Sequence, residues 1–268
     1  MSTHRTISKE QIRYIDGAAY ERTIGKWSQI AGETFLDWLA PSQNLRWIDV
    51  GCGNGSFTEL LVQRCAPSAI AGVDPAEAQL AYARSRTTAR AAEFRRGDAM
   101  ALPYPDDTFD AAVMALVIFF VPDPAKGVAE MKRVVRPDGV VAAYAWDMMN
   151  GGFPFDAMQV EMRELGVPPT YPPMYEVSGV EALRKVWKAA GLAAVETREF
   201  AAHRTYDDFE DLWTTSSLTA SVAPKFATMP AAVVETLKAR VRARSPADVS
   251  GHITSSARIT AVKGRVPK

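Results

Sequence analysis

The stretch Trp47-Ile48-Asp49-Val50-Gly51-Cys52-Gly53-Asn54-Gly55-Ser56 decides the fold of this chain. It begins with the apolar residues of a buried strand, breaks into three alternate glycines and is expected to lead into a helix. Glycines have no Cβ, so the backbone can turn sharply there and a ligand can approach it at the N-terminal end of that helix. The stretch predicts an α/β fold with a nucleotide-type cofactor at the end of its first strand.

The carboxylate of Asp49 narrows the choice of cofactor. A dinucleotide fingerprint reads G-x-G-x-x-G, but Ser56 occupies the sixth position counted from Gly51. A pyrophosphate would also face the negative charge of Asp49 in a partly dry cleft, which disfavours it. A cofactor with a cationic amino-acid end would be attracted instead. Glycines that serve only the shape of a strand-turn-helix are the alternative interpretation.

Length and composition favour one large α/β domain with an insert, because the chain has 268 residues and is 47% hydrophobic. The formal net charge is zero and no block of like charges occurs, so nucleic acid is not an expected partner and a small molecule is. No apolar run reaches membrane-spanning length, and the polar start of the chain is not typical of a secretory signal.

Cysteine and histidine usage points to a reducing, cytoplasmic location without a metal site. Cys52 and Cys65 cannot form a disulfide framework. No C-x-x-C motif is present, and His4, His203 and His252 are scattered along the chain, so no zinc site is expected.

Short apolar segments alternate with helical ones after Pro41, which is typical of a parallel sheet covered on both faces. The residue pattern predicts strands over 45–50, 69–73, 92–95, 109–116, 140–145, 193–200 and 253–262, and helices over 54–65, 76–86, 124–135 and 180–190. Residues 10–40 and 207–244 also have helical spacing, and 146–177 form an insert rich in proline and methionine.

Three carboxylates follow the ends of the first three predicted strands. Because ligands of doubly wound sheets bind beyond the carboxyl ends of the strands, Asp49, Asp74 and Asp98 should converge on one cleft. The position of Asp74 suits hydrogen bonds to a ribose diol, in a nicotinamide enzyme as well as in other adenosine-binding proteins. Asp74 followed by Pro75 could also simply begin the next helix, and the two roles are compatible.

Asp49, Gly51, Gly53 and Gly55 match the acidic-x-G-x-G-x-G motif of the class I S-adenosylmethionine (SAM)-dependent methyltransferases, which the chain resembles over about 45–147. The resemblance is strongest to small-molecule methyltransferases of the ubiquinone/menaquinone biosynthesis type, the methyltransferase type 11 family. Further matches are Gly97-Asp98-Ala99, the linker Leu102-Pro103-Tyr104-Pro105, Val121-Pro122-Asp123-Pro124 and the segment from Glu130 to Gly139.

This resemblance implies a Rossmann-like, doubly wound sheet of seven mostly parallel strands with one antiparallel strand, helices on both faces and a helical lid. It divides the chain into an N-terminal helical segment covering the cofactor (1–40), a SAM-binding core (41–147), and an insert or lid with the remaining strands of the same domain (148–268).

The resemblance also implies the cofactor site. Asp49 would hold the methionine ammonium, Asp74 the ribose, and Asp98 with Ala99 the adenine. The N-terminal segment is similar to one that folds across the cofactor, with Tyr20, Tyr14 and Trp27 near the methionine end, although a core role for Trp27 is an equal alternative. The other implied cofactor contacts are Gly51, Cys52, Gly53, Gly55, Pro75, Gln79 and Leu116.

The acceptor side departs from the family pattern. Ile118-Phe119-Phe120 stands where many relatives carry a polar pair, often with histidine, which indicates an apolar acceptor pocket or packing under the next helix. His203 is the remaining candidate for a general base, with a structural role as its alternative. Residues expected near the acceptor by position alone are Tyr144, Trp146, Asp147 and Tyr175.

Three functional hypotheses remain open from the sequence. A SAM-dependent methyltransferase acting on a small, apolar or aromatic molecule is favoured. A nicotinamide-dependent oxidoreductase and a non-catalytic SAM-binding protein are the alternatives. The methyl acceptor and its reacting atom, the use of a base and the pathway are not readable from the residues, and the oligomeric state is also open, a homodimer being compatible with them.

Overall fold

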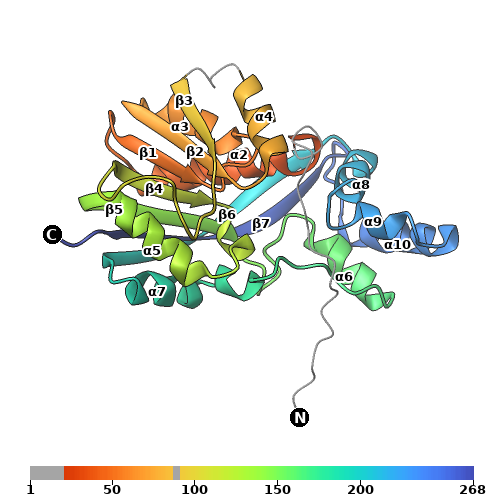
Figure 1. Ribbon diagram of the computed structural model, residues 1–268. Coiled ribbons are helices and arrows are strands. Elements are labelled where there is room, and N and C mark those ends of the chain that lie inside the picture. The colour runs from red at the N-terminus through yellow and green to blue at the C-terminus, as the bar shows by residue number, and fades with distance from the viewer. Residues whose placement is uncertain (1–20, 87–90) are drawn as a thin grey trace, which may run out of the picture.

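A seven-stranded twisted sheet forms the centre of the computed structural model, which describes residues 21–86 and 91–268 (Figure 1). Within these residues the strand order is β3-β2-β1-β4-β5-β7-β6. β7 runs antiparallel to β5 and β6, and all other neighbours are parallel. This architecture confirms the predicted fold class. The strands are β1 (Arg46–Val50), β2 (Ala69–Asp74), β3 (Ala92–Arg96), β4 (Phe109–Ala115), β5 (Val135–Trp146), β6 (Ala193–Tyr206) and β7 (Ile253–Arg265).

The central strands are apolar almost throughout because both faces of the sheet are covered. In β1, Trp47, Ile48 and Val50 are fully buried, and in β4 the run 111–114 is buried without interruption. The strand order reverses between β1 and β4, so the loops that follow these two strands diverge and open a crevice at the carboxyl end of the sheet.

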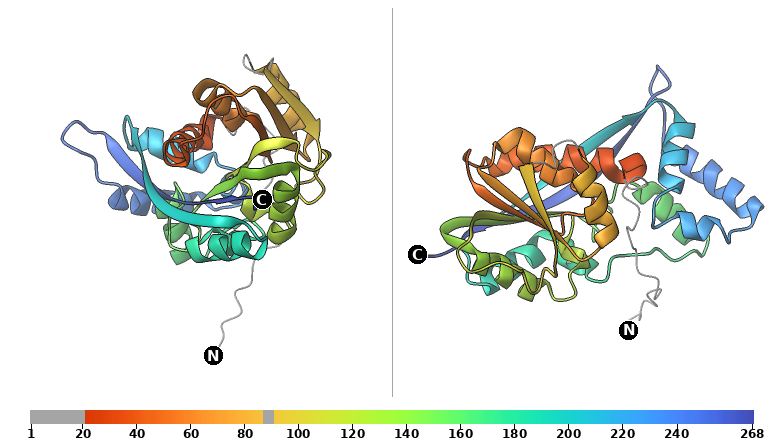
Figure 2. Two further views of the ribbon diagram at one scale, coloured as in Figure 1. Left: turned by 90° about the vertical axis from the view of Figure 1, so that its left-hand side faces the viewer. Right: turned by 45° about the horizontal axis from the view of Figure 1, so that its top comes forward.

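Two layers of helices cover the sheet (Figure 2). Helices on one face are α2 (Lys26–Leu39), α3 (Ser56–Cys65) and α4 (Glu77–Ser85), and helices on the other face are α5 (Pro124–Val134) and α7 (Val180–Ala189). A short π-helical turn, η1 (Glu21–Gly25), precedes α2. Among the residues described, none of the helices combines the length and apolarity that crossing a bilayer requires.

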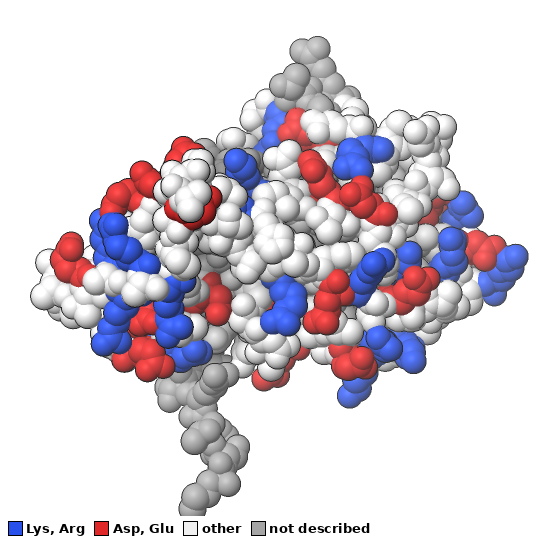
Figure 3. Space-filling model, turned by 180° about the vertical axis from the view of Figure 1, so that it is seen from behind, with Lys and Arg blue, Asp and Glu red and all other residues white. Residues whose placement is uncertain are grey.

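A helical lobe, called the lid below, stands beyond the end of the sheet at which β6 ends (Figure 1). It is formed by α6 (Asp156–Glu164), between β5 and α7, and by α8 (Phe209–Ser217), α9 (Ala223–Phe226) and α10 (Ala231–Arg244), between β6 and β7. α10 packs against α6, so the two insertions meet. Acidic and basic side chains are interspersed on this lobe, at the left of Figure 3.

Several element boundaries differ from those predicted. β6 continues to Tyr206, because it goes on pairing with β7 beyond the residues of β7 that pair with β5. β7 continues to Arg265, where it pairs with Val140 of β5 and Ala193 of β6. β5 starts at Val135, before the predicted start at residue 140, and residues 136–139 lie between its pairs with Phe109 and Ala111 as an irregularity of the strand. The helical stretch 207–244, expected from the sequence to be interrupted by Pro224 and Pro230, consists of three helices.

Candidate active site

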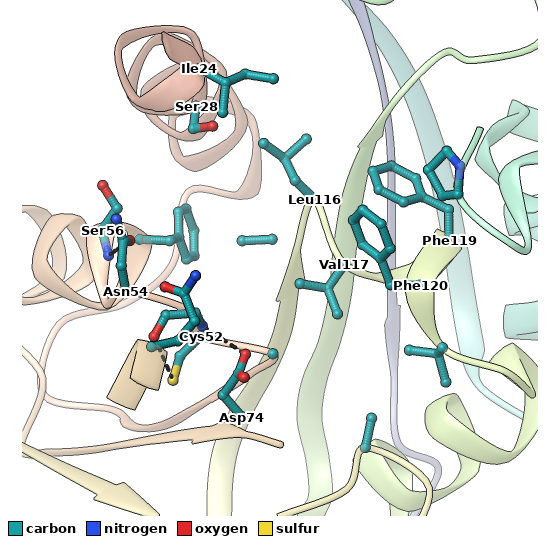
Figure 4. Close-up of a pocket in the computed structure, with 18 of the residues that line it drawn as sticks. Ile24, Ser28, Cys52, Asn54, Ser56, Asp74, Leu116, Val117, Phe119 and Phe120 are labelled. Carbon is teal, nitrogen blue, oxygen red and sulfur yellow. Dashed lines mark hydrogen bonds between the residues drawn. The ribbon is translucent and has the colours of Figure 1, made fainter. Parts of the chain in front are cut away.

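A cavity of about 340 Å³ lies at the carboxyl ends of β1, β2 and β4, the expected position for a ligand in a doubly wound sheet (Figure 4). Its size falls within the range of small-molecule sites. Residues from segments far apart in the chain meet in its wall. Those predicted to contact a cofactor and found there are Asp49, Gly51, Cys52, Gly53, Asp74, Pro75, Gln79, Asp98, Ala99 and Leu116.

The three glycines of the turn have different surroundings. A Cβ on Gly51 would lie 2.4 Å from Val117 Cγ1, so this glycine allows the turn to pack against the end of β4. Gly53 has a φ of +53°, and a Cβ there would meet no atom within 4 Å, so this glycine leaves room for a ligand. Gly55 packs against Ala83 of α4 and is outside the cavity wall. Its predicted role as a direct contact is therefore replaced by helix packing.

Asp49 is the buried charge of the site. Its side chain is fully buried, and Oδ2 accepts a hydrogen bond of 2.6 Å from Thr58 Oγ1. Oδ1 has no hydrogen-bond partner among the described residues. Burial raises the pKa of Asp49 to about 7, opposed by the Thr58 hydrogen bond and assisted by the negative charge of Asp74. A buried carboxylate oxygen without a donor is costly, and a cationic donor on a ligand would satisfy it.

Asp74 joins the glycine turn to the start of α4. Oδ2 accepts from the Gly53 amide at 3.0 Å and Oδ1 accepts from the Ala76 amide at 2.8 Å. Burial raises the pKa of Asp74, and these two hydrogen bonds oppose the shift. Each carboxylate oxygen keeps a second lone pair for a ligand hydroxyl. The alternative of Asp74 as the helix cap with Pro75 as the first helical residue is wrong, because Ala76 is the N-cap and α4 begins at Glu77. The hydrogen bond from Ala76 only shapes the turn before the helix and leaves capacity for a diol.

Asp98 lies at the open side of the cavity. It is exposed, and its Oδ1 accepts a hydrogen bond of 2.8 Å from the amide of Met100, which shapes the loop after β3. Ala99 is half-buried beside it in the cavity wall. The three carboxylates therefore run from the buried Asp49 through the partly buried Asp74 to the exposed Asp98.

Trp27 belongs to the core and not to the cavity wall. Its side chain has no exposed surface, its Nε1 donates to the Tyr206 hydroxyl at 2.9 Å, and its ring stands edge-to-face to Trp146. The structure therefore favours the core alternative over the predicted cofactor contact. Ile24 and Ser28, one helical turn apart, face the cavity instead (Figure 4). Tyr14 and Tyr20 lie outside the described residues.

The wall opposite Asp74 is apolar (Figure 4). Phe119 and Phe120 belong to a short 3-10 helix, η3 (Ile118–Phe120), and their rings meet edge to face with centroids 4.9 Å apart. Phe119 is also buried, so packing and cavity lining coexist. Tyr144 and Trp146 line this region as predicted by position, together with Met148 and Phe153.

Leu116 marks the point at which the chain leaves β4 for this wall. It adopts a φ of +60°, a conformation that a leucine rarely takes, while its amide donates to the Tyr144 carbonyl at 2.9 Å. Such strain persists where the surrounding structure fixes it, often at a functional site.

The lid, which was expected from the insert and the later helices of the sequence, also contributes side chains to the cavity. Gln159 from α6, Thr170 and Pro172 from the following loop, and Ser221 from the loop between α8 and α9 line it. The sequence predicted a lid in this region but did not identify these individual side chains. Its contacts depend on the docking of the lid against the sheet.

His203 is not positioned to act as a base on a ligand in this cavity. It lies in β6 opposite Ser256 of β7, in the part of the ribbon that extends beyond the parallel sheet, and its side chain is exposed. Two other residues expected near the acceptor are also placed elsewhere. Asp147 is buried in contact with Arg258 and Asn150, and Tyr175 lines a second, neighbouring cavity.

The strand order with its single reversed strand and the position of the cavity define the class I methyltransferase fold. Residues 48–143, which run from β1 into β5 and include the glycine turn and all three carboxylates, match the methyltransferase domain family. This match over residues 48–143 supports the resemblance to class I SAM-dependent methyltransferases that the motifs predict.

Curated relatives of the chain include 2-methyl-6-phytyl-1,4-hydroquinone methyltransferase 2, chloroplastic, of Oryza sativa subsp. japonica. It is 40% identical over 127 residues, 45% of this chain and 36% of the relative. The ubiquinone/menaquinone biosynthesis C-methyltransferase UbiE of Roseobacter denitrificans is 34% identical over 111 residues, 40% of this chain and 44% of the relative. The chain thus spans less than half the length of these relatives.

Solved structures share the fold at low identity. Phosphoethanolamine N-methyltransferase 2 of Haemonchus contortus, in complex with SAM, superimposes with a TM-score of 0.58 at 16% identity, covering 94% of this chain and 56% of the other. This similarity concerns the fold alone. The comparisons give no support to the nicotinamide-dependent alternative.

Proposed function

We propose that the chain transfers a methyl group from SAM to a small, predominantly apolar or aromatic molecule. The observation that carries this proposal is Asp49 Oδ1, a buried carboxylate oxygen in the wall of the cavity that receives no hydrogen bond from residues 21–86 or 91–268. SAM supplies a methyl group on a sulfonium and carries an ammonium that would meet this oxygen. The methyltransferase relatives support the same cofactor.

We propose that the other two carboxylates, Asp74 and Asp98, bind the remaining parts of the cofactor. Asp74 would accept hydrogen bonds from the ribose hydroxyls, and Asp98 with Ala99 would meet the adenine. Gly53 has no side chain, which leaves space for the cofactor to approach the glycine turn. We include Tyr14 and Tyr20 as contacts from the N-terminal segment, on the family resemblance alone. Further contacts proposed from the cavity wall are Cys52, Pro75, Gln79 and Leu116.

The acceptor would lie against Phe119 and Phe120. Methyl transfer is an in-line displacement, so the protein contributes mainly by aligning the acceptor and excluding water. An apolar wall and a lid that reaches into the cavity serve both purposes. The hydroquinone and ubiquinone/menaquinone named for the relatives make a quinol-like aromatic acceptor the natural first candidate.

The setting of this activity is part of the proposal. Two buried free cysteines suit a reducing compartment, which supports a cytoplasmic location. The zero net charge favours a small molecule over nucleic acid as acceptor. We include a homodimer in the proposal, and light scattering of the purified protein measures its oligomeric state directly.

Calorimetric titration tests the cofactor. We expect SAM and S-adenosylhomocysteine to bind and NAD not to bind. Asp49→Asn should weaken the binding of SAM at least tenfold, because an amide lacks the negative charge that attracts an ammonium. Asp110→Asn is the matched control, since Asp110 pairs with Arg46 and Arg136 away from the cavity and should leave SAM affinity unchanged. Binding of NAD without SAM would support an oxidoreductase.

Transfer of a labelled methyl group to a panel of phenols, hydroquinones and naphthoquinols tests the reaction. Product should form with at least one apolar aromatic acceptor, and Phe119→Ala should raise the acceptor KM more than it changes SAM affinity. SAM binding without transfer to any member of the panel would favour a non-catalytic SAM-binding protein.

A further inference from the structure

A second cavity, of about 210 Å³, lies between α6 and the loop that follows it. Asp156, Val160 and Arg163 of α6 line it, at spacings of four and three residues, which places them on one face of the helix. The same helix directs Gln159 to the first cavity and Glu161 to α10. α6 therefore separates two cavities while its third face anchors the lid.

The two cavities are neighbours. Met148 lines both of them. In the loop after α6, Thr170 and Pro172 line the first cavity, whereas Tyr171 between them lines the second. Besides α6, the wall between the cavities thus includes the flexible Met148 side chain and the stretch of chain from Thr170 to Pro172. A molecule held against the apolar wall of the first cavity could extend into the second past Met148.

Four polar side chains of the second cavity are free of hydrogen bonds and ion pairs to other side chains within the described residues. The carboxylate of Asp156, the guanidinium of Arg163 and the hydroxyls of Tyr171 and Tyr175 make no side-chain hydrogen bond or ion pair there. Asp156 is half-buried, and burial raises the pKa of its carboxyl, opposed by Arg163 and Arg244. Polar groups gathered around a cavity normally bind something, either water or a ligand.

The chemistry of these groups indicates an uncharged ligand. One carboxylate and one guanidinium balance each other, so a cation would be opposed by Arg163 and an anion by Asp156. The carboxylate only accepts hydrogen bonds, the guanidinium only donates them, and each tyrosine hydroxyl does both. The rings of Tyr171 and Tyr175 stack at 4.7 Å and present an aromatic surface. A polyhydroxylated group, with donors, acceptors and apolar C–H faces, matches this set.

We propose that the second cavity is a subsite for an uncharged, polyhydroxylated, sugar-like end of the methyl acceptor. The acceptor then has two parts: an apolar part that receives the methyl group against Phe119 and Phe120, and a hydroxyl-rich part held by Asp156, Arg163 and Tyr171. This subsite rests on the proposed function of the first cavity, because it takes the other end of the same molecule.

Four octyl amphiphiles with one tail and different head groups test this proposal. They are octyl β-D-glucoside, octyltrimethylammonium, octanoate and octyl sulfobetaine, titrated below their micellar concentrations into the full chain saturated with S-adenosylhomocysteine. The glucoside should bind at least tenfold more tightly than the cationic, anionic and zwitterionic probes. Equal or tighter binding of any charged probe overturns the assignment.

Variants separate the subsite from the apolar cavity. Tyr171 is partly exposed and Arg163 is exposed. Tyr171→Phe and Arg163→Gln should each weaken the binding of the glucoside about fivefold and leave the affinities of the other probes within twofold. Glu164→Gln, the exposed neighbour outside the cavity, is the control and should change nothing. Unchanged glucoside affinity in both variants would refute the subsite. Failure of S-adenosylhomocysteine to bind would instead refute the proposed function, so the two failures are distinguishable.

Discussion

At the scale of single residues, Asp49 combines the signals that the sequence and the structure provide. Its position two residues before the first glycine predicted a cationic ligand. The structure adds that its side chain is fully buried and that Oδ1 lacks a donor among the described residues. No local pattern could have shown this, because burial and hydrogen bonding depend on α3 and on the cavity. The sequence therefore indicated the position of Asp49, but not the energetic cost of burying its carboxylate.

The first prediction concerns pH and stability. Burial raises the pKa of Asp49 from 3.8 to about 7. The folded chain therefore binds more protons than the unfolded chain between these values, and its free energy of unfolding falls as pH rises through this window. One pKa unit corresponds to about 1.36 kcal/mol, so above pH 7 the ionised Asp49 lowers the free energy of unfolding by roughly 4 kcal/mol. Asp49→Asn should raise the free energy of unfolding in urea at about pH 8 and change it little at about pH 4.

The same variant should affect SAM in the opposite direction. An ammonium stabilises the ionised carboxylate, so SAM affinity of the wild type should rise between about pH 6 and pH 8, and this rise should vanish in Asp49→Asn. Asp110 is the contrasting control: hydrogen bonds from Arg46 and Arg136 hold its pKa at about 2, against its desolvation. Its contribution to stability is present above about pH 4 and lost below it. A less stable Asp49→Asn at pH 8 would contradict this account.

At the scale of elements, α10 is attached to the protein by two buried apolar side chains and by four ion-paired cations. Leu237 and Val241 are its buried residues. Arg240 and Arg244 pair with Glu161 of α6, and Lys238 and Arg242 pair with Glu210 of α8. Cations four residues apart share one helix face, so each pair reaches one carboxylate. Figure 3 shows the resulting mixture of charges on the lid.

The second prediction follows from this attachment. Glu161 is only 7% exposed, and Glu161→Gln removes the charge that Arg240 and Arg244 share. We expect the lid to lose about 1–3 kcal/mol of local stability, because two cations lose a nearly buried anion. Limited proteolysis within residues 218–250 should accelerate, and about 0.5 M salt should accelerate it in the wild type as well.

Glu164→Gln is the matched control for the lid, because Glu164 is exposed on the same helix and forms no ion pair among the described residues. It should digest like the wild type. Equal digestion of the Glu161 and Glu164 variants would show that apolar contacts of Leu237 and Val241 are sufficient to hold α10.

At the scale of the whole molecule, contacts between distant segments connect the start of the described chain to its later strands. The indole of Trp27 in α2 donates to the hydroxyl of Tyr206, which ends β6, across 179 residues of sequence. The ring of Trp27 also meets Trp146 at the end of β5. This junction fixes α2, and with it Ile24 and Ser28, over the cavity.

The third prediction tests this junction. Tyr206→Phe leaves the indole Nε1 of Trp27 buried without an acceptor, which should reduce the free energy of unfolding in urea by about 1–3 kcal/mol. SAM affinity should fall as well, because α2 lines the cavity. Tyr82→Phe, at a partly exposed position of α4, is the control and should leave both quantities close to wild type. A Tyr206 variant as stable as the wild type would mean that the apolar packing of the two tryptophans holds α2 by itself.

The sequence by itself determined the sheet, the turn and the three carboxylates, because strand alternation, glycine conformation and the charges at strand ends are local properties. Only the tertiary structure decided what depends on residues distant in sequence. It placed Trp27 in the core and His203 on an exposed ribbon, and it gave the lid a share of the cavity wall. It also brought the polar groups of the second cavity together, since the side chains of α6 and its following loop acquire their surroundings only when those segments dock against the sheet.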